Sequence, residues 1–154
     1  MNITGISILP HYRHLRHVDL SNNNITDISP LGSPYLSRIT YLNLSHNRIE
    51  NPAINTHKSL QVLNLSDNCI STLSETALSH PFLTRLDLSG NSLEELKGIS
   101  DPSIPLRFLE ARCNKINNCS GLNPNIEELE LVCSLIYLIH SLYLYLVRQS
   151  NHGC

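Results

Sequence analysis

The chain has no tryptophan, few aromatic residues and few charges, and each shortage narrows the classes of function that remain. Aromatic residues make up 5% of its 154 residues, charged residues 16%, and the formal net charge is −2. Proteins that hold nucleic acid or anionic lipid by electrostatics carry a basic excess, so we expect no nucleic-acid partner. The phosphate-binding loop, the dinucleotide fingerprint, the serine-hydrolase elbow and the zinc-protease motif are also missing. We therefore expect no enzyme activity and no cofactor.

Cysteine is present without the organisation of a disulfide framework. The five cysteines are Cys69, Cys113, Cys119, Cys133 and Cys154. An odd and irregularly spaced set does not suggest paired bridges. The first ten residues also lack the charged segment and the apolar run of a secretory signal. Because disulfides persist mainly in oxidising compartments, we expect a reduced, cytoplasmic chain.

Histidine and cysteine do not combine into an expected metal site. His11, His14 and His17 recur every three residues, but a proline precedes them and His17 falls within an expected strand. They are therefore not expected to share one helical face. Cys113 and Cys119 have neither C-x-x-C spacing nor a nearby histidine. We interpret them as small buried or edge thiols and expect no metal.

What the chain does have is a repeat. Residues 83–93 read L-T-R-L-D-L-S-G-N-S-L, which matches the leucine-rich repeat signature L-x-x-L-x-L-x-x-N-x-L. Six copies begin at residues 15, 39, 60, 83, 106 and 126, with Ala111 replacing a leucine in the fifth and Ser134 replacing the asparagine in the sixth. We divide the chain into a degenerate N-terminal repeat or cap (1–14), six leucine-rich repeats (15–136) and an apolar non-repeat tail (137–154).

The repeat predicts an α/β solenoid, specifically a segment of a leucine-rich-repeat horseshoe. The central x-L-x-L-x is expected to form a short strand whose leucines point inward, because strand side chains alternate. Stacked strands then form a parallel sheet on the concave face, with turns, 3₁₀ pieces or short helix on the convex face. Residues 74–80 are a candidate for one or two helical turns there.

The repeated asparagine has a predicted structural role. Its side chain carries both a hydrogen-bond acceptor and a donor, so it can bond backbone groups of adjacent turns that the sheet leaves unpaired. Buried backbone groups without a partner are costly. The expected asparagine ladder comprises Asn23, Asn47, Asn68, Asn91 and Asn114.

The residues that flank the inward leucines are expected to form three outward rows on the concave face. The first row contains His17, Tyr41, Val62, Arg85, Phe108 and Glu128. The second contains Asp19, Asn43, Asn64, Asp87, Glu110 and Glu130. The third contains Ser21, Ser45, Ser66, Ser89, Arg112 and Val132. The first row therefore exposes apolar and aromatic side chains beside a second row that has acids and amides but no base.

Aromatic residues and arginine are the usual anchors of protein interfaces, although strands also favour Tyr, Val and Phe for intrinsic reasons. We predict that this face binds a protein or peptide partner that carries basic residues. The predicted binding residues are His17, Asp19, Tyr41, Asn43, Val62, Asn64, Arg85, Asp87, Phe108, Glu110 and Arg112.

The stretch 131–147 reads L-V-C-S-L-I-Y-L-I-H-S-L-Y-L-Y-L-V and leaves three interpretations open. It could cross a membrane and make the chain a membrane-tethered binding module, but it is shorter than the roughly 20 apolar residues that a spanning helix needs and contains His140. It could form a buried capping helix or strand over the last repeat. It could also be a C-terminus that departs from the ancestral repeat design, as when a gene model or splice form runs past an exon boundary.

Two stretches carry a resemblance. Residues 15–31, L-R-H-V-D-L-S-N-N-N-I-T-D-I-S-P-L, and 60–70, L-Q-V-L-N-L-S-D-N-C-I, resemble the intracellular leucine-rich repeat family with repeats of about 22 residues. That family includes a regulatory subunit of protein phosphatase 1 and ciliary proteins. Residues 3–31 look like the start of a radial-spoke component of motile cilia and sperm flagella. The resemblance implies a non-catalytic scaffold or adaptor of the axoneme, or alternatively a regulatory subunit that docks an enzyme such as protein phosphatase 1.

Overall fold

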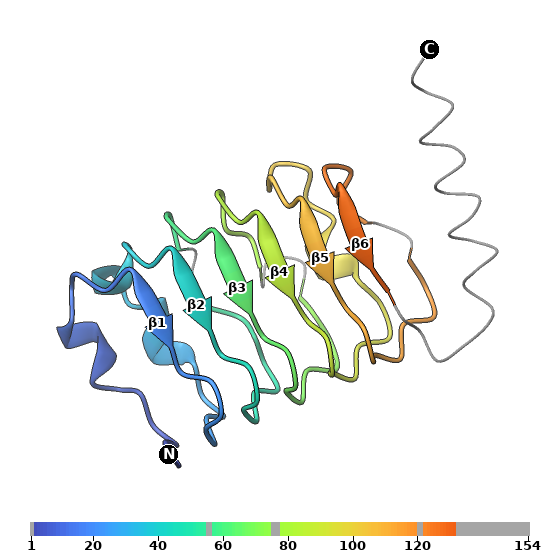
Figure 1. Ribbon diagram of the computed structural model, residues 1–154. Helices are drawn as coiled ribbons and strands as arrows, with labels where there is room; N and C mark the ends of the chain where they lie inside the picture. Colours follow the sequence, from blue (N-terminus) through green and yellow to red (C-terminus); the bar gives the residue numbers. More distant parts are fainter. Residues whose placement is uncertain (1, 55–56, 75–77, 120–121, 132–154) are drawn as a thin grey trace.

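Six short parallel strands stand side by side in chain order in the computed structural model (Figure 1). The structure describes residues 2–54, 57–74, 78–119 and 122–131. The strands are β1 (His17–Asp19), β2 (Tyr41–Asn43), β3 (Val62–Asn64), β4 (Arg85–Asp87), β5 (Phe108–Glu110) and β6 (Glu128–Glu130). Each strand is paired in parallel with the next. The predicted fold class, a leucine-rich-repeat solenoid with a short-strand parallel sheet, is confirmed.

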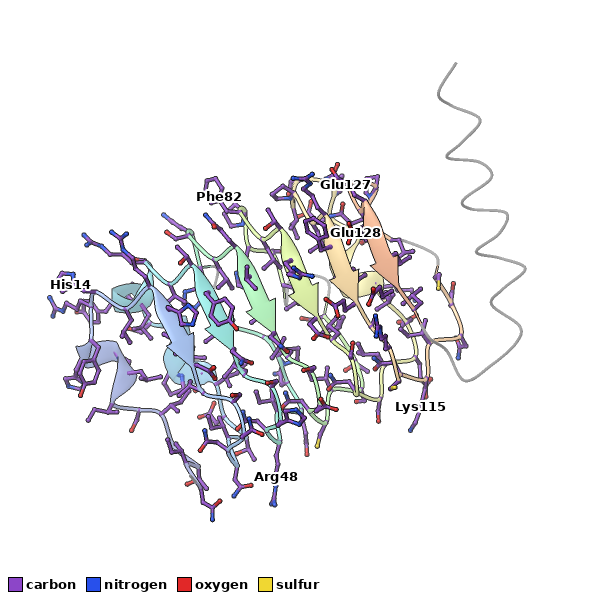
Figure 2. All side chains as sticks on the ribbon, in the orientation of Figure 1. His14, Arg48, Phe82, Lys115, Glu127 and Glu128 are labelled. Carbon is purple, nitrogen blue, oxygen red and sulfur yellow. The ribbon has the colours of Figure 1, made fainter. Side chains whose placement is uncertain are left out.

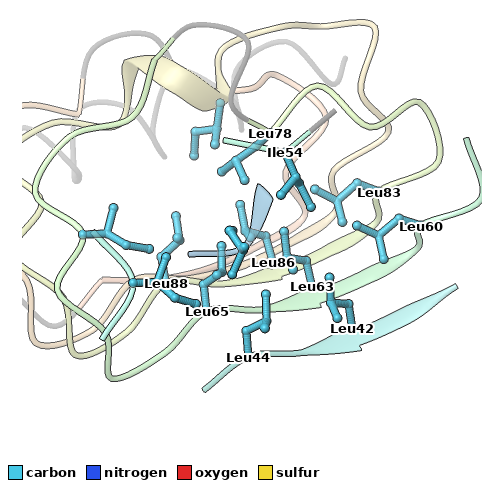
Figure 3. Packing of buried hydrophobic residues seen from close by; sticks show 14 of the residues in the cluster. Leu42, Leu44, Ile54, Leu60, Leu63, Leu65, Leu78, Leu83, Leu86 and Leu88 are labelled. Atoms are coloured by element: carbon cyan, nitrogen blue, oxygen red, sulfur yellow. The ribbon is translucent and has the colours of Figure 1, made fainter. Parts of the chain in front are cut away.

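The leucine at the centre of each strand points into one continuous interior. Leu42, Leu63 and Leu86 lie directly opposite one another in the register and are fully buried. The leucines that follow the strands, such as Leu44 and Leu65, join the same cluster (Figure 3). Burial of each such side chain contributes about 1.5–3 kcal/mol. The interior therefore locks the strand register, and the register fixes which residues face outward.

The return segments contain short 3₁₀ helices and no long helix among the described residues. These are η1 (Leu9–His11), η2 (Ser29–Gly32), η3 (Pro34–Leu36) and η4 (Lys97–Ile99). Proline stands at the start of the first three, where its missing N–H costs nothing. The helix predicted at 74–80 falls partly outside the described residues, since 75–77 are not among them.

The repeated asparagines join consecutive turns of the solenoid. Asn47 donates through Nδ2 to the carbonyl oxygens of Leu20 and Leu44, both at 3.0 Å. Its Oδ1 accepts from the N–H of Ile25 at 3.0 Å. Asn68, Asn91 and Asn114 repeat this pattern one turn later each. Each asparagine therefore satisfies backbone groups of its own turn and of the preceding one, which would otherwise be buried without partners.

The first asparagine of the ladder receives the N-terminal segment instead of a complete repeat. Asn23 Oδ1 accepts from the N–H of Ile3 at 3.0 Å. Ile6 is buried in the same interior as the leucines, and η1 packs against η2 and η3. The described residues before β1 therefore lie against the first turn of the solenoid.

The apolar stretch of the sequence begins where the described residues end. Leu131 is partly buried against the core, and residues 132–154 lie outside the described part of the chain. The tail predicted at 137–154, and its three interpretations, therefore remain predictions. Within the four described ranges, no helix has the length and apolar character needed to span a bilayer.

Candidate functional site

The strand register places the first and second predicted rows on one face of the sheet. His17, Tyr41 and Val62 stand in line across β1 to β3, and the line continues through Arg85, Phe108 and Glu128. Asp19, Asn43, Asn64, Asp87, Glu110 and Glu130 form the parallel row at the other end of the strands. His14, Phe82 and Glu127, which precede strands, mark one edge of this face, and Arg48 and Lys115, which follow strands, mark the opposite edge (Figure 2).

The third predicted row is wrong at two of its four serines. Ser45 and Ser66 are only 7% and 8% exposed, so they do not face a partner. Ser89 is partly buried, and Arg112 is exposed. The cause is a turn at the end of each strand. Asn64 Oδ1 accepts from the N–H of Ser66 at 2.8 Å, which folds the chain inward.

The same turn gives the second row a structural role that the sequence reasoning missed. Asp19, Asn43 and Asp87 each accept from the backbone N–H two residues later, at 2.9, 3.1 and 2.9 Å. The bonded N–H of Ser21 lowers the pKa of the Asp19 carboxyl. The signal was present, because an Asn or Asp stands two residues before Ser in the repeated N-L-S and D-L-S triplets.

The first strands of the face are joined by a ring stack. The rings of His17 and Tyr41 lie 4.0 Å apart between centroids and 3° from parallel. Beside them, Asn43 Nδ2 donates to Asp19 Oδ2 at 3.3 Å. These contacts hold the Tyr41 ring in one orientation on the surface.

The last strands are joined by ion pairs. Arg85 bonds Glu110 at 3.3 Å and lies over the ring of Phe108 at 5.4 Å. The guanidinium of Arg107 lies 5.6 Å from the centre of that ring. Arg107 also bonds Glu127 at 2.6 Å, and this bond holds the pKa of the Glu127 carboxyl below its usual value. A further pair joins Arg112 to Glu130.

A hollow of about 360 Å³ lies between these two regions. Its lining comes from β2, β3, β4 and β5: Tyr41, Val62, Leu63, Asn64, Arg85, Asp87 and Glu110. Its formal charges are one cation and two carboxylates. Six of the residues that the sequence predicted for binding therefore meet around one depression, while His17 and Phe108 lie beside it.

The three N-terminal histidines are separated in the structure. The ring of His11 contacts the backbone carbonyl of Ile8 at 3.1 Å, His14 faces Arg38 at 3.5 Å, and His17 stacks on Tyr41. In the part of the chain that the structure describes, no group of three or more His, Cys, Asp or Glu residues could hold a metal ion. Cys69 and Cys113 are exposed free thiols.

Comparison with known proteins decides the family. The model of the family described as leucine-rich repeats (two copies) matches residues 13–55 and 58–100. The chain belongs to the leucine-rich repeat family. Human leucine-rich repeat-containing protein 23 is 37% identical over 113 residues, which cover 72% of this chain and 32% of that protein. The narrower resemblance seen at residues 3–31 was to this same protein, and the match confirms it.

Other relatives carry the repeat in different surroundings. Human leucine-rich repeats and immunoglobulin-like domains protein 1 is 31% identical over 147 residues, covering 90% of this chain and 13% of that protein. An internalin from Listeria monocytogenes superposes with a TM-score of 0.64 at 23% identity, over 84% of this chain and 38% of the internalin chain. The latter likeness concerns the fold alone. The chain spans about a third of the length of the leucine-rich repeat-containing protein 23 relatives.

Leucine-rich-repeat solenoids present extended concave surfaces, and such surfaces are typical of protein–protein interaction. The fold therefore agrees with the predicted class of partner. The fold leaves open which residues bind the partner.

Proposed function

We propose that the chain is a non-catalytic scaffold or adaptor that binds a partner protein on its concave face. One observation carries the proposal. Tyr41, Val62 and Phe108 are apolar or aromatic side chains that stand outside the interior, in one row with the exposed Arg85. Side chains of these kinds dominate the binding energy of protein interfaces when a partner covers them.

The chemistry of the face supports binding rather than catalysis. Its arginines bond acids of neighbouring strands, and its Asp and Asn residues bond turn backbone. Within the described ranges, none of these groups forms a nucleophile, a base and an orienting group in hydrogen-bond sequence. The interior fixes the strand register, so the face offers a rigid surface that requires little ordering on binding.

The similarity to leucine-rich repeat-containing protein 23 supports a place in the axoneme of cilia or flagella. Affinity capture from ciliated and from non-ciliated cells tests this location. A partner captured only from ciliated cells supports the axonemal scaffold. Capture of protein phosphatase 1 from both cell types would instead favour the regulatory-subunit alternative.

Truncation of two aromatic anchors tests the binding face. We expect the double variant Tyr41→Ala, Phe108→Ala to lose partner capture by roughly thirtyfold or more, because truncation of an interface anchor typically costs 2 kcal/mol or more. Partner capture by the purified chain, quantified against wild type, measures the loss. Circular dichroism and urea unfolding check that the sheet is intact.

The chain offers a matched control with two exposed aromatic residues. Tyr12 and Tyr35 are 54% and 52% exposed and lie outside the strands, Tyr12 after η1 and Tyr35 in η3. The double variant Tyr12→Ala, Tyr35→Ala is expected to capture the partner normally. Normal capture by the Tyr41, Phe108 variant would refute the proposed binding face.

A further inference from the structure

The hollow on the concave face has an apolar floor and two walls of different character. Val62 forms part of its floor on β3, and Tyr41 and Arg85 stand on the neighbouring strands. A volume of about 360 Å³ is near the lower end for binding pockets, so the hollow suits one long side chain better than a large ligand.

The Tyr41 wall presents the face of an aromatic ring. His17 on β1 stacks on one face of that ring. Because β1 and β3 lie on opposite sides of β2, the ring face that lines the hollow is the one directed toward β3. An aromatic face of this kind attracts a cation within about 6 Å of its centre.

The Arg85 wall presents a methylene stem rather than a cation. Both contacts of its guanidinium, Glu110 and Phe108, are on β5, on the far side of β4 from Val62. The charged end of Arg85 is therefore turned away from Val62 and is paired. Its stem can cover apolar surface in the way that long basic side chains usually do.

The carboxylate of Asp87 gives the hollow its unbalanced charge. Asp87 lines the hollow and accepts from the N–H of Ser89 at 2.9 Å, which fixes its orientation. Among the described residues Asp87 forms no ion pair, whereas the carboxylate of Glu110 is paired with Arg85. The lining charges therefore sum to one negative charge, and Asp87 lies at the other end of the strands from the row that contains Tyr41 and Val62.

We propose that this hollow seats one lysine or arginine side chain of the partner protein. The methylene stem would lie over Val62 and against Tyr41, and the charged group would lie beside Asp87. Only a basic side chain combines an apolar stem of this length with a terminal cation. The inference deepens the proposed function and rests on the concave face being the surface that the partner covers.

NMR of the full chain tests directly whether a basic side chain binds in the hollow, with the methyl resonances of Val62 as the reporter. The probes are Gly-Ser peptides that contain several lysines or several arginines, compared with peptides that contain norleucine or glutamate at the same places. Norleucine has the lysine stem without the charge. We expect saturable shifts of the Val62 resonances with the lysine or the arginine peptide and none with the other two.

Two substitutions with the same local chemistry supply the matched pair. Asp87→Asn removes the charge and keeps the oxygen that accepts from Ser89, as Asn43 and Asn64 do at the equivalent positions. It should weaken binding of the basic peptide about fivefold, the upper end for an exposed ion pair. Asp27→Asn makes the same change before η2, outside the hollow and outside the strands, where Asp27 accepts from the N–H of Ser29 at 2.8 Å, and should leave the affinity unchanged.

Several results would overturn the proposal. These are absent Val62 shifts with both basic peptides, equal shifts with norleucine, or equal losses in the Asp27→Asn and Asp87→Asn variants. The capture assay separates this proposal from the proposed function. If Asp87→Asn captures the partner normally while the Tyr41, Phe108 double variant does not, the binding face stands and the basic-residue seat is wrong.

Discussion

The concave face is held together differently in its first and last strands. Across β1 and β2, a ring stack and an amide-to-carboxylate bond join neighbouring strands without an ion pair. From β4 to β6, the joining contacts are ion pairs between Arg and Glu. Salt weakens the attraction between exposed charges, and the screening length is about 10 Å at 0.1 M ionic strength. It affects ring stacking much less. One surface therefore combines a salt-insensitive and a salt-sensitive half, with the hollow at their junction.

The convex side shows a second difference at one repeat position, three residues before the first leucine. His57 and His80 occupy it in the third and fourth repeats, and both are almost fully buried, 2% and 0% exposed. The N–H of His57 donates to His80 Nδ1 at 3.1 Å, and Nε2 of each ring has no partner among the described residues. In the sixth repeat, Asn123 fills the position and donates to the carbonyls of Asp101 and Ile104. The middle of the solenoid is therefore titratable at a position where the last repeat is not.

The largest expected effect comes from the leucine row that follows the strands. Leu44, Leu65 and Leu88 fill this row, and the fifth repeat has the buried Ala111 instead. Leu65→Ala should lower the free energy of unfolding by about 3–4 kcal/mol, because a cavity forms between two well-packed turns. Urea unfolding measures the loss.

The control for the cavity lies on β3, the strand that Leu65 directly follows. Val62→Ala removes apolar atoms from the partly exposed face, so it should cost less than about 1 kcal/mol. Comparable losses of stability in Leu65→Ala and Val62→Ala would mean that Leu65 is packed no more tightly than Val62 on the concave face.

The histidine pair predicts a loss of stability in mild acid. Burial, with a smaller effect of His57, lowers the pKa of His80 to about 4 in the folded chain. The unfolded chain has a value near 6.5, so it binds more protons than the folded chain between these two values. Stability is therefore complete above about pH 6.5 and falls as the pH decreases toward 4, by about 2–3 kcal/mol at the lower end.

Unfolding in urea across this pH range, for wild type and for His80→Asn, measures the effect. Asparagine can still accept from the N–H of His57 but does not titrate, and Asn123 shows that this repeat position accommodates an amide. The variant should lose the contribution of His80 to the decline between pH 6.5 and 4, while the contributions of the surface carboxylates and of His57, whose pKa burial also lowers, remain. An unchanged decline in His80→Asn would rule out His80 as a source of it.

The sequence was sufficient for the parts of the molecule that follow the leucine period. The inward positions of Leu42, Leu63 and Leu86, and hence the alignment of Tyr41 with Val62, depend only on strand alternation and repeat spacing. The structure confirms the fold that this reasoning predicted. Whether the aligned residues bind a partner stays a prediction.

Other features depend on conformation that the leucine pattern does not encode. Ser45 and Ser66 were expected to continue the outward alternation, but each strand is only three residues long, and the turn that follows it buries the serine. His57 and His80 occupy equivalent positions of consecutive repeats, so the repeat spacing does align them. The leucine signature does not indicate that this position is buried or that the two side chains meet there.

The smallest expected effects test the contrast between the two halves of the face directly. His17→Ala removes the ring stack and should cost about 1 kcal/mol, whereas Glu110→Gln removes the partner of Arg85 and should cost about 0.5 kcal/mol. Raising the salt concentration from roughly 0.05 to 0.5 M should abolish the deficit of Glu110→Gln. At the higher concentration the exposed ion pair between Arg85 and Glu110 is screened in wild type, so its removal changes the stability little. The deficit of His17→Ala should persist, since the stacked rings of His17 and Tyr41 are not joined by an ion pair. Urea unfolding of both variants at each salt concentration measures the four values. If the two deficits change in parallel with salt, the first and last strands are not held by different forces.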